Sequence, residues 1–166
     1  MDAMRTDGFG DLYNSVLETG IRAVIVLEHL RPVGVDLQEM VLFDHVVVHT
    51  GDHGGPPSLH AAVPERKGEL LVRRRLVEQS LRLMRQCHLV AEAHDAYGIS
   101  YRASDEAAAY VELLETPYSE RLKRCSAWIR EEVKLHTKNG FKDRLCARIG
   151  DWAEAFNRAE RPAREV

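Results

Sequence analysis

The chain has 166 residues, 45% of them hydrophobic and 30% charged, which is enough for one buried core but short for two domains. Its formal net charge is -3, whereas a domain that works mainly on nucleic acid is usually basic because it must neutralise phosphates. The composition therefore argues against a dedicated DNA binder. A chain with this net charge can nevertheless carry a local basic surface.

The lack of targeting signals in the sequence, together with its cysteine content, predicts a reduced, cytoplasmic setting. No stretch comes near the roughly 18 apolar residues that a membrane-spanning helix needs. The N-terminus lacks the basic-then-apolar order of a signal peptide. The cysteines, Cys87, Cys125 and Cys146, form an odd set without CxxC spacing, so we expect small buried side chains rather than a disulfide framework or a metal site.

Helical periodicity dominates the first part of the chain. Ser15 and Glu18 have the spacing of a capping box and open a helix that Pro32 stops. Asp36 caps a second helix that includes the β-branched residues 46–48. Those residues alone would suit a strand, but the cap and the flanking period favour a helix.

Glycines and prolines between residues 51 and 68 exclude a continuous helix and predict a long connection. A third helix is expected over residues 68–88. The short alternating runs 89–93 and 99–103, joined by an Asp- and Gly-containing turn, predict a β-hairpin.

Three more helices are expected after the hairpin. The first is capped by Ser104 and runs to about residue 115, and the second begins at Pro117 and ends before Asn139-Gly140. The last covers residues 141–157.

This order predicts a mainly α fold with a small β-hairpin, namely a winged helix-turn-helix domain with extra C-terminal helices. The expected divisions are a flexible N-terminus (1–12), the winged-helix domain (13–137), a C-terminal amphipathic helix (141–158) and a flexible tail (159–166).

The helix expected before the hairpin is rich in arginine. Residues 65–88 carry seven cations against three acids, in a chain that is acidic overall. One interpretation is a surface that contacts phosphates, and the other is a solvated helix face with internal ion pairs. The candidate DNA or phosphate contacts are Arg73, Arg74, Arg75, Arg82 and Arg85.

The connection after the second helix is a candidate structural or functional loop, and histidines gather around it. His45 and His49 are four residues apart, as in helical metal sites, but Val46 stands where a zincin needs Glu, so we predict no metal site. The favoured interpretation is that Asp52 and the histidines tie the loop to the helix end by hydrogen bonds. The loop residues singled out are Asp52, Gly54, Gly55, Pro56, Pro57 and His60.

Motifs for catalysis are missing from the sequence. It contains no GxSxG elbow, no GxxxxGK[ST] loop and no GxGxxG fingerprint, and its cysteines have no identifiable activating partner. We therefore expect no catalytic residues, no cofactor and no enzyme activity.

The last expected helix has a narrow apolar stripe with two large aromatic residues. Such a stripe either packs on the core of its own domain or docks on a partner. The candidate partner-binding residues are Leu145, Ile149, Trp152 and Phe156.

Several segments resemble one bacterial family over about residues 13–130. They are Tyr13–Ala23, Phe43–His45, His49–Asp52, Gly54–His60, Gly68–Arg74 and Gly98–Ala103. They are similar to the middle components of ABC three-component systems, the Lamassu-type anti-phage operons.

The resemblance implies a small winged-helix protein encoded beside an SMC- or RecN-like ABC ATPase and an effector, often a nuclease. It implies an adaptor that sits on the ATPase heads and helps to hold the effector inactive until foreign DNA is sensed. A stand-alone winged-helix DNA-binding transcription regulator, using the arginine-rich helix, is the alternative.

Overall fold

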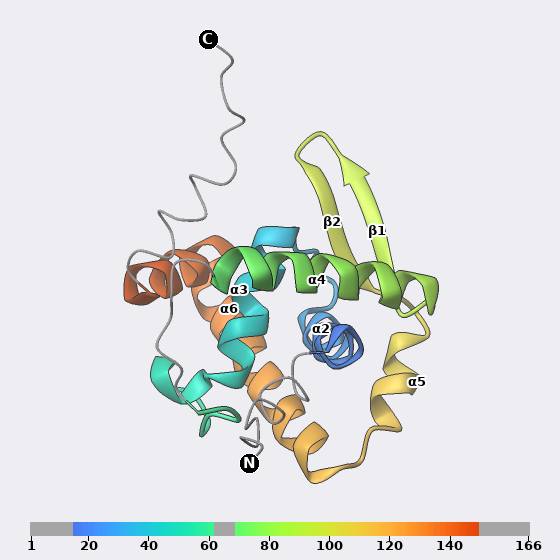
Figure 1. The fold of residues 1–166 in the computed structure, drawn as a ribbon. Coiled ribbons are helices and arrows are strands. Elements are labelled where there is room, and N and C mark those ends of the chain that lie inside the picture. The colour runs from blue at the N-terminus through green and yellow to red at the C-terminus, as the bar shows by residue number, and fades with distance from the viewer. Residues whose placement is uncertain (1–14, 62–68, 150–166) are drawn as a thin grey trace, which may run out of the picture.

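The computed structural model describes residues 15–61 and 69–149 of the chain. Its elements follow the order helix, helix, short 3-10 helix, helix, hairpin, helix, helix (Figure 1). This mainly helical, winged-helix-like arrangement with a long C-terminal helix confirms the predicted fold class.

Helix α2 (Val16–Leu30) begins where the sequence predicted, with the Ser15 side chain accepting a hydrogen bond from the Glu18 N–H at 3.2 Å. Helix α3 (Leu37–Val48) begins with a complete capping box between Asp36 and Glu39. Residues 46–48 belong to this helix and are buried, which confirms helix over strand. The 3-10 helix η1 (Thr50–His53) follows directly.

Helix α4 (Glu69–Gln86) leads into an antiparallel hairpin of β1 (Val90–Asp95) and β2 (Gly98–Ala103). The strands pair up to Asp95 and Gly98, so only two residues form the turn and the connection is tighter than the sequence predicted. Gly98 has φ +119°, a conformation that glycine adopts without steric cost.

The hairpin is tied to the segment between α2 and α3. Val35 accepts from the Tyr101 N–H at 2.7 Å and donates to the Tyr101 carbonyl at 3.0 Å, forming a single bridge to β2. The root of the wing is therefore fixed to the helical body, while its tip extends away from it (Figure 1).

Helix α5 (Ala107–Glu112) is shorter than predicted, and Ser104 does not cap it. The Ser104 hydroxyl instead donates to the His88 carbonyl at 2.6 Å, because the residue still belongs to the base of the hairpin. The cap position is taken by Glu106, whose side chain makes no capping bond.

Helix α6 (Pro117–Ile149) contains a sharp break at Thr137, where φ is 61° and ψ is 161°. The Thr137 hydroxyl accepts from the Gly140 N–H at 3.2 Å and so caps the second half of the helix. Next to the break, Lys138 donates to the Gly34 carbonyl and pairs with Glu39, both at 3.0 Å. The break lies close to the predicted one at Asn139-Gly140.

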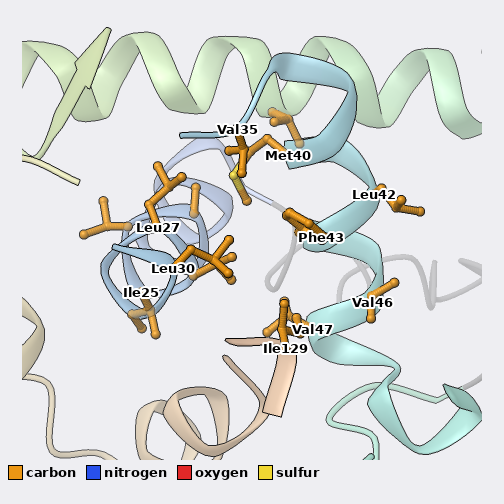
Figure 2. Packing of buried hydrophobic residues seen from close by; sticks show 14 of the residues in the cluster. Ile25, Leu27, Leu30, Val35, Met40, Leu42, Phe43, Val46, Val47 and Ile129 are labelled. Atoms are coloured by element: carbon orange, nitrogen blue, oxygen red, sulfur yellow. The ribbon is translucent and has the colours of Figure 1, made fainter. Parts of the chain in front are cut away.

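Helix α2 lies at the centre and contacts α3, α4, α5 and α6. Figure 2 shows Leu30 of α2 on the side that faces α3 and Ile129 of α6, whereas Ile25 and Leu27 lie on other sides of the same helix. Phe43 of α3 stacks on Phe141, with ring centroids 6.2 Å apart, so the second half of α6 joins this core.

The cysteines differ in their surroundings. Cys125 is buried in the core and Cys146 is half-buried, but Cys87 at the end of α4 is exposed, so the prediction of a buried side chain is wrong there. Helix α4 ends one residue earlier, at Gln86, and the last side chain that it buries is that of Met84.

Candidate functional site

The arginine-rich helix α4 lies across the top of the body in Figure 1, with the wing rising behind it. Its inner face is buried through Val77, Leu81 and Met84. The five arginines singled out by the sequence do not share one environment, because they point to different sides of the helix.

Arg73 is held inside the protein rather than offered to a ligand. Its Nη1 donates to Oδ2 of Asp44 at 2.7 Å, and Asp44 is 1% exposed. From the other side, Nε of Arg22 donates to Oδ1 of the same carboxylate at 2.9 Å. One carboxylate on α3 therefore joins α2 to α4 through two arginines.

The two arginines together offset the effect of burial on the Asp44 carboxylate. Burial alone raises the pKa of Asp44, but Arg22 and Arg73 together hold it below its usual value. Arg22 is 2% exposed, and it also donates to the Thr19 hydroxyl at 3.2 Å. Asp44 is therefore an ionised carboxylate in the core.

Arg85 and Arg74 face the wing side of α4. Nη1 of Arg85 pairs with Oε2 of Glu92 on β1 at 2.5 Å, which connects the end of the helix to the hairpin. Arg74 is half-buried, and its Nη1 has no hydrogen-bond partner among the described residues.

Only Arg75 and Arg82 lie fully on the outer face of α4. They are exposed, as are Gln79 and Gln86, and the four residues follow one another at helical spacing along this face. Neither arginine forms an ion pair with another residue of the described ranges. Of the five candidate phosphate contacts, Arg75 and Arg82 are therefore the two that are exposed and form no ion pair within the described residues.

The wing itself is weakly acidic and ends in apolar side chains. Its two strands and turn carry Glu92 and Asp95 against Arg102. At the tip, Tyr97 is 99% exposed and Ile99 is 45% exposed. Such a tip suits contact with a protein surface better than contact with phosphates.

The loop after α3 is packed against α6. Gly54 has φ +81°, and a Cβ at Gly55 would lie 2.7 Å from the Trp128 ring, so the backbone rests directly on the indole. The Thr50 hydroxyl donates to the Pro56 carbonyl at 2.8 Å, and the Ser58 hydroxyl accepts from the Gly51 N–H at 3.0 Å.

Three of the loop residues noted in the sequence, Asp52, Gly54 and Pro57, remain exposed. The backbone N–H of Asp52 donates to the His49 carbonyl at 3.1 Å. The bonds that fix the loop therefore include hydroxyl and backbone groups that the sequence analysis did not single out.

The histidines form a packed row beside Asp44. The ring centroids of His45 and His49 are 4.7 Å apart, those of His49 and His60 are 6.3 Å apart, and Nε2 of His60 lies 3.0 Å from the Tyr118 hydroxyl. Burial, followed by the charge of Arg73, lowers the pKa of His45 to about 3. Burial and then Arg22 lower the pKa of His60 to about 4.

These depressed values predict an acid-sensitive fold. We expect His45 alone to lower the free energy of unfolding by about 2 kcal/mol between pH 7 and pH 5, because the unfolded ring takes its proton near pH 6.5 and the folded ring near pH 3. This stability is present above the unfolded pKa and is lost as the pH falls toward the folded one. Urea denaturation at pH 7, 6 and 5 measures the slope.

His45→Gln should flatten that pH dependence, since glutamine does not titrate. His94→Gln is the matched control, because His94 lies 67% exposed on the hairpin. An unchanged slope in His45→Gln would contradict the assignment.

Comparison with known proteins identifies the family of this chain. A family described as "ABC-three component (ABC-3C) system Middle Component 2" matches residues 12–155. The chain belongs to this family. The matched range includes every helix and strand described above. Neither the comparison with curated proteins nor that with solved structures found a match.

In this middle component, the apolar stripe that was predicted near the C-terminus lies partly in the core and partly outside the described residues. Leu145 is 2% exposed and belongs to the core cluster with Phe141. Trp152 and Phe156 lie outside the described residues, as does the side chain of Ile149. The partner-binding role of the stripe stays a prediction, and Leu145 is not a free contact residue in this arrangement.

Within residues 15–61 and 69–149, no group of three or more His, Cys, Asp or Glu side chains is placed to hold a metal ion. In the same ranges no helix of the middle component is long and apolar enough to cross a bilayer.

Sequence reasoning missed the buried Arg22–Asp44–Arg73 group. A signal was available, because Arg22 interrupts an otherwise apolar run from Ile21 to Leu27, and a charge in such a place needs a buried partner. The identity of that partner depends on how the helices pack, which a helical period does not give.

Proposed function

We propose that this middle component is a non-catalytic adaptor that bridges an SMC- or RecN-like ABC ATPase and an effector nuclease in a cytoplasmic, Lamassu-type anti-phage complex. Membership of a three-component family supports the existence of partner components. The observation that carries the adaptor role is the wing, whose tip is apolar and whose charge is unsuited to DNA.

The distribution of the arginines supports the same proposal. Arg73 and Arg85 neutralise acids of the protein itself, so they join its own elements together. A rigid helix and wing present a fixed surface to a partner, and preorganisation of this kind reduces the entropy lost on binding.

The adaptor proposal predicts that the protein co-purifies with the ATPase and the effector encoded beside it. The double variant Tyr97→Ser/Ile99→Ser should lose one of these components, with its Kd raised at least about tenfold, because exposed aromatic side chains dominate many interfaces. Size-exclusion chromatography and titration of the purified components measure the loss.

A matched control is the pair Leu135→Ser/Val72→Ser, which removes two exposed apolar side chains from other elements. If the wing variant binds both components like the wild type, the wing is not the contact. If the wild type binds neither component, the adaptor proposal fails.

The second candidate, a DNA-binding regulator, is favoured by the outer stripe of Arg75, Gln79, Arg82 and Gln86. Arginine and glutamine are residue types that read guanine and adenine in the major groove. This candidate requires the isolated protein to shift promoter DNA at low salt. Arg75→Glu/Arg82→Glu should abolish that shift, whereas Arg130→Glu/Lys134→Glu on α6 should leave it intact.

A further inference from the structure

The wing has two edges, and the helical body covers one of them. Along β2, the N–H and carbonyl of Tyr101 point outward, where they bond to Val35. Hydrogen bonds within an antiparallel pair alternate along the strands, so Glu92, which lies opposite Tyr101, does not bond to β2 either. The bond from the Ser104 N–H to the Leu89 carbonyl fits the same alternation. The N–H and carbonyl of Glu92 therefore point to the second edge of the wing.

This edge of β1 presents four unpaired backbone groups. His94 follows Glu92 by two residues, so both direct their N–H and carbonyl outward, at positions about 7 Å apart. Within the described ranges the sheet has two strands, and no residue bonds to these four groups. Alternating donors and acceptors at this spacing match the backbone of an extended chain. Phosphate oxygens only accept, so they match half of the groups.

The edge lacks the usual protection against a further strand. Natural edge strands are shielded by lysine, by proline or by a bulge. Strand β1 contains no lysine or proline, and its register with β2 runs without a bulge from Val90 to Asp95. Glu92 places a charge on the strand, but its carboxylate is already bound to Arg85 and His94. The strand is therefore open to pairing.

The side chains of β1 favour a basic neighbour. The strand carries two acids and no Lys or Arg. Asp95 is exposed and pairs with no cation among the described residues, while its Oδ1 accepts the Tyr97 N–H at 2.7 Å. Opposite charges on adjacent strands stabilise their pairing, and like charges weaken it. A third strand that carries a Lys or Arg beside Asp95 thus fits better than an acidic one.

We propose that this edge of β1 binds an extended, basic segment of another component of the three-component system, which adds a third strand to the wing. The backbone of the segment bonds to Glu92 and His94, and its cation lies beside Asp95. The proposal rests on the proposed adaptor function. The edge is continuous with the exposed tip residues Tyr97 and Ile99, so one partner covers both.

Amide hydrogen exchange, resolved to single residues, tests the edge in the full chain. In the free protein the amides of Glu92 and His94 should exchange fast, whereas those of Ala91 and Ala93, bonded to β2, should exchange slowly. In the complex with the purified ATPase or effector, the first two should slow at least about tenfold. Unchanged rates at both amides in a formed complex overturn the proposal.

Substitutions separate the backbone from the side chains. His94→Pro removes an outward N–H that the hairpin does not use, and should raise the Kd for the component at least about tenfold. His94→Gln keeps this N–H and should retain the affinity that His94→Pro loses. Asp95→Asn keeps the acceptor for Tyr97 but removes the charge, so the Kd should rise about two- to fivefold at low salt.

Wild-type affinity in folded His94→Pro, or an equal loss in His94→Gln, overturns the backbone contact. Tighter binding by Asp95→Asn overturns the basic segment. If His94→Pro does not form the hairpin, the exchange rates of the wild-type complex decide.

Failure of the adaptor function gives a different pattern. In that case the wild type binds neither component, and the edge proposal fails with it. Binding without slowed exchange at Glu92 and His94 overturns only the edge proposal. Slowed exchange at these amides in the chain alone, increasing with its concentration, identifies a second copy as the occupant and also overturns it.

Discussion

Replacing Asp44 with alanine is expected to lower the free energy of unfolding by about 3–5 kcal/mol, the usual cost of leaving a buried charge without its partner. The variant would leave Arg22, 2% exposed, without its carboxylate, and would also release Arg73. Urea denaturation at pH 7 measures the change. The effect is large because two arginines from two helices depend on one carboxylate.

The matched control is Asp105→Ala, which removes a fully exposed carboxylate that also pairs with an arginine, Arg31, at 3.5 Å. Surface pairs contribute little, so this variant should change stability by less than about 1 kcal/mol. Equal effects in the two aspartate variants would contradict the role given to the buried group.

Phe141→Ala is expected to cost about 3–5 kcal/mol, as for other large-to-small changes in a core. Its side chain is 2% exposed, stacks on Phe43 and meets the Trp128 ring edge-on at 5.9 Å. The same denaturation experiment measures the loss.

This variant also reports on whether the chain after the Thr137 break belongs to the core. If that segment were a detachable docking helix, Phe141→Ala would leave stability nearly unchanged. Leu135→Ala, 73% exposed before the break, is the control and should stay within about 0.5 kcal/mol of the wild type.

Sequence patterns predicted the helices and the hairpin well where local chemistry decides the outcome. The capping box of Asp36 and Glu39 fixes the start of α3, and the apolar period of residues 77, 81 and 84 fixes the inner face of α4. Both signals are local, because a cap or a helical face is complete within a few turns.

The same patterns were less successful where tertiary contacts decide. Ser104 has the features of a helix cap, but the fold places its hydroxyl on the His88 carbonyl. The arginine run of α4 could be read as one surface, yet Asp44 and Glu92, from other elements, take two of its members. No period in α4 itself carries that information.

A cavity of about 250 Å³ beside α2 was also invisible to sequence reasoning. It exists because the connection after α5 and the start of α6 approach α2 from a distant part of the chain, so that Leu114 and Tyr118 line the same space as Ile21. A space between elements depends on the shape of their packing, so it is not a property of any one segment.

The bridge between Val35 and Tyr101 gives the wing the mechanics of a lever. Its exposed tip is the long arm, and its fulcrum is the short connection in which Gly34 also accepts a bond from Lys138 of α6. A force applied at Tyr97 would act at the junction of α2, α3 and the break in α6. A component that pulls on the wing would thereby load the centre of the helical body, rather than only bending a free hairpin.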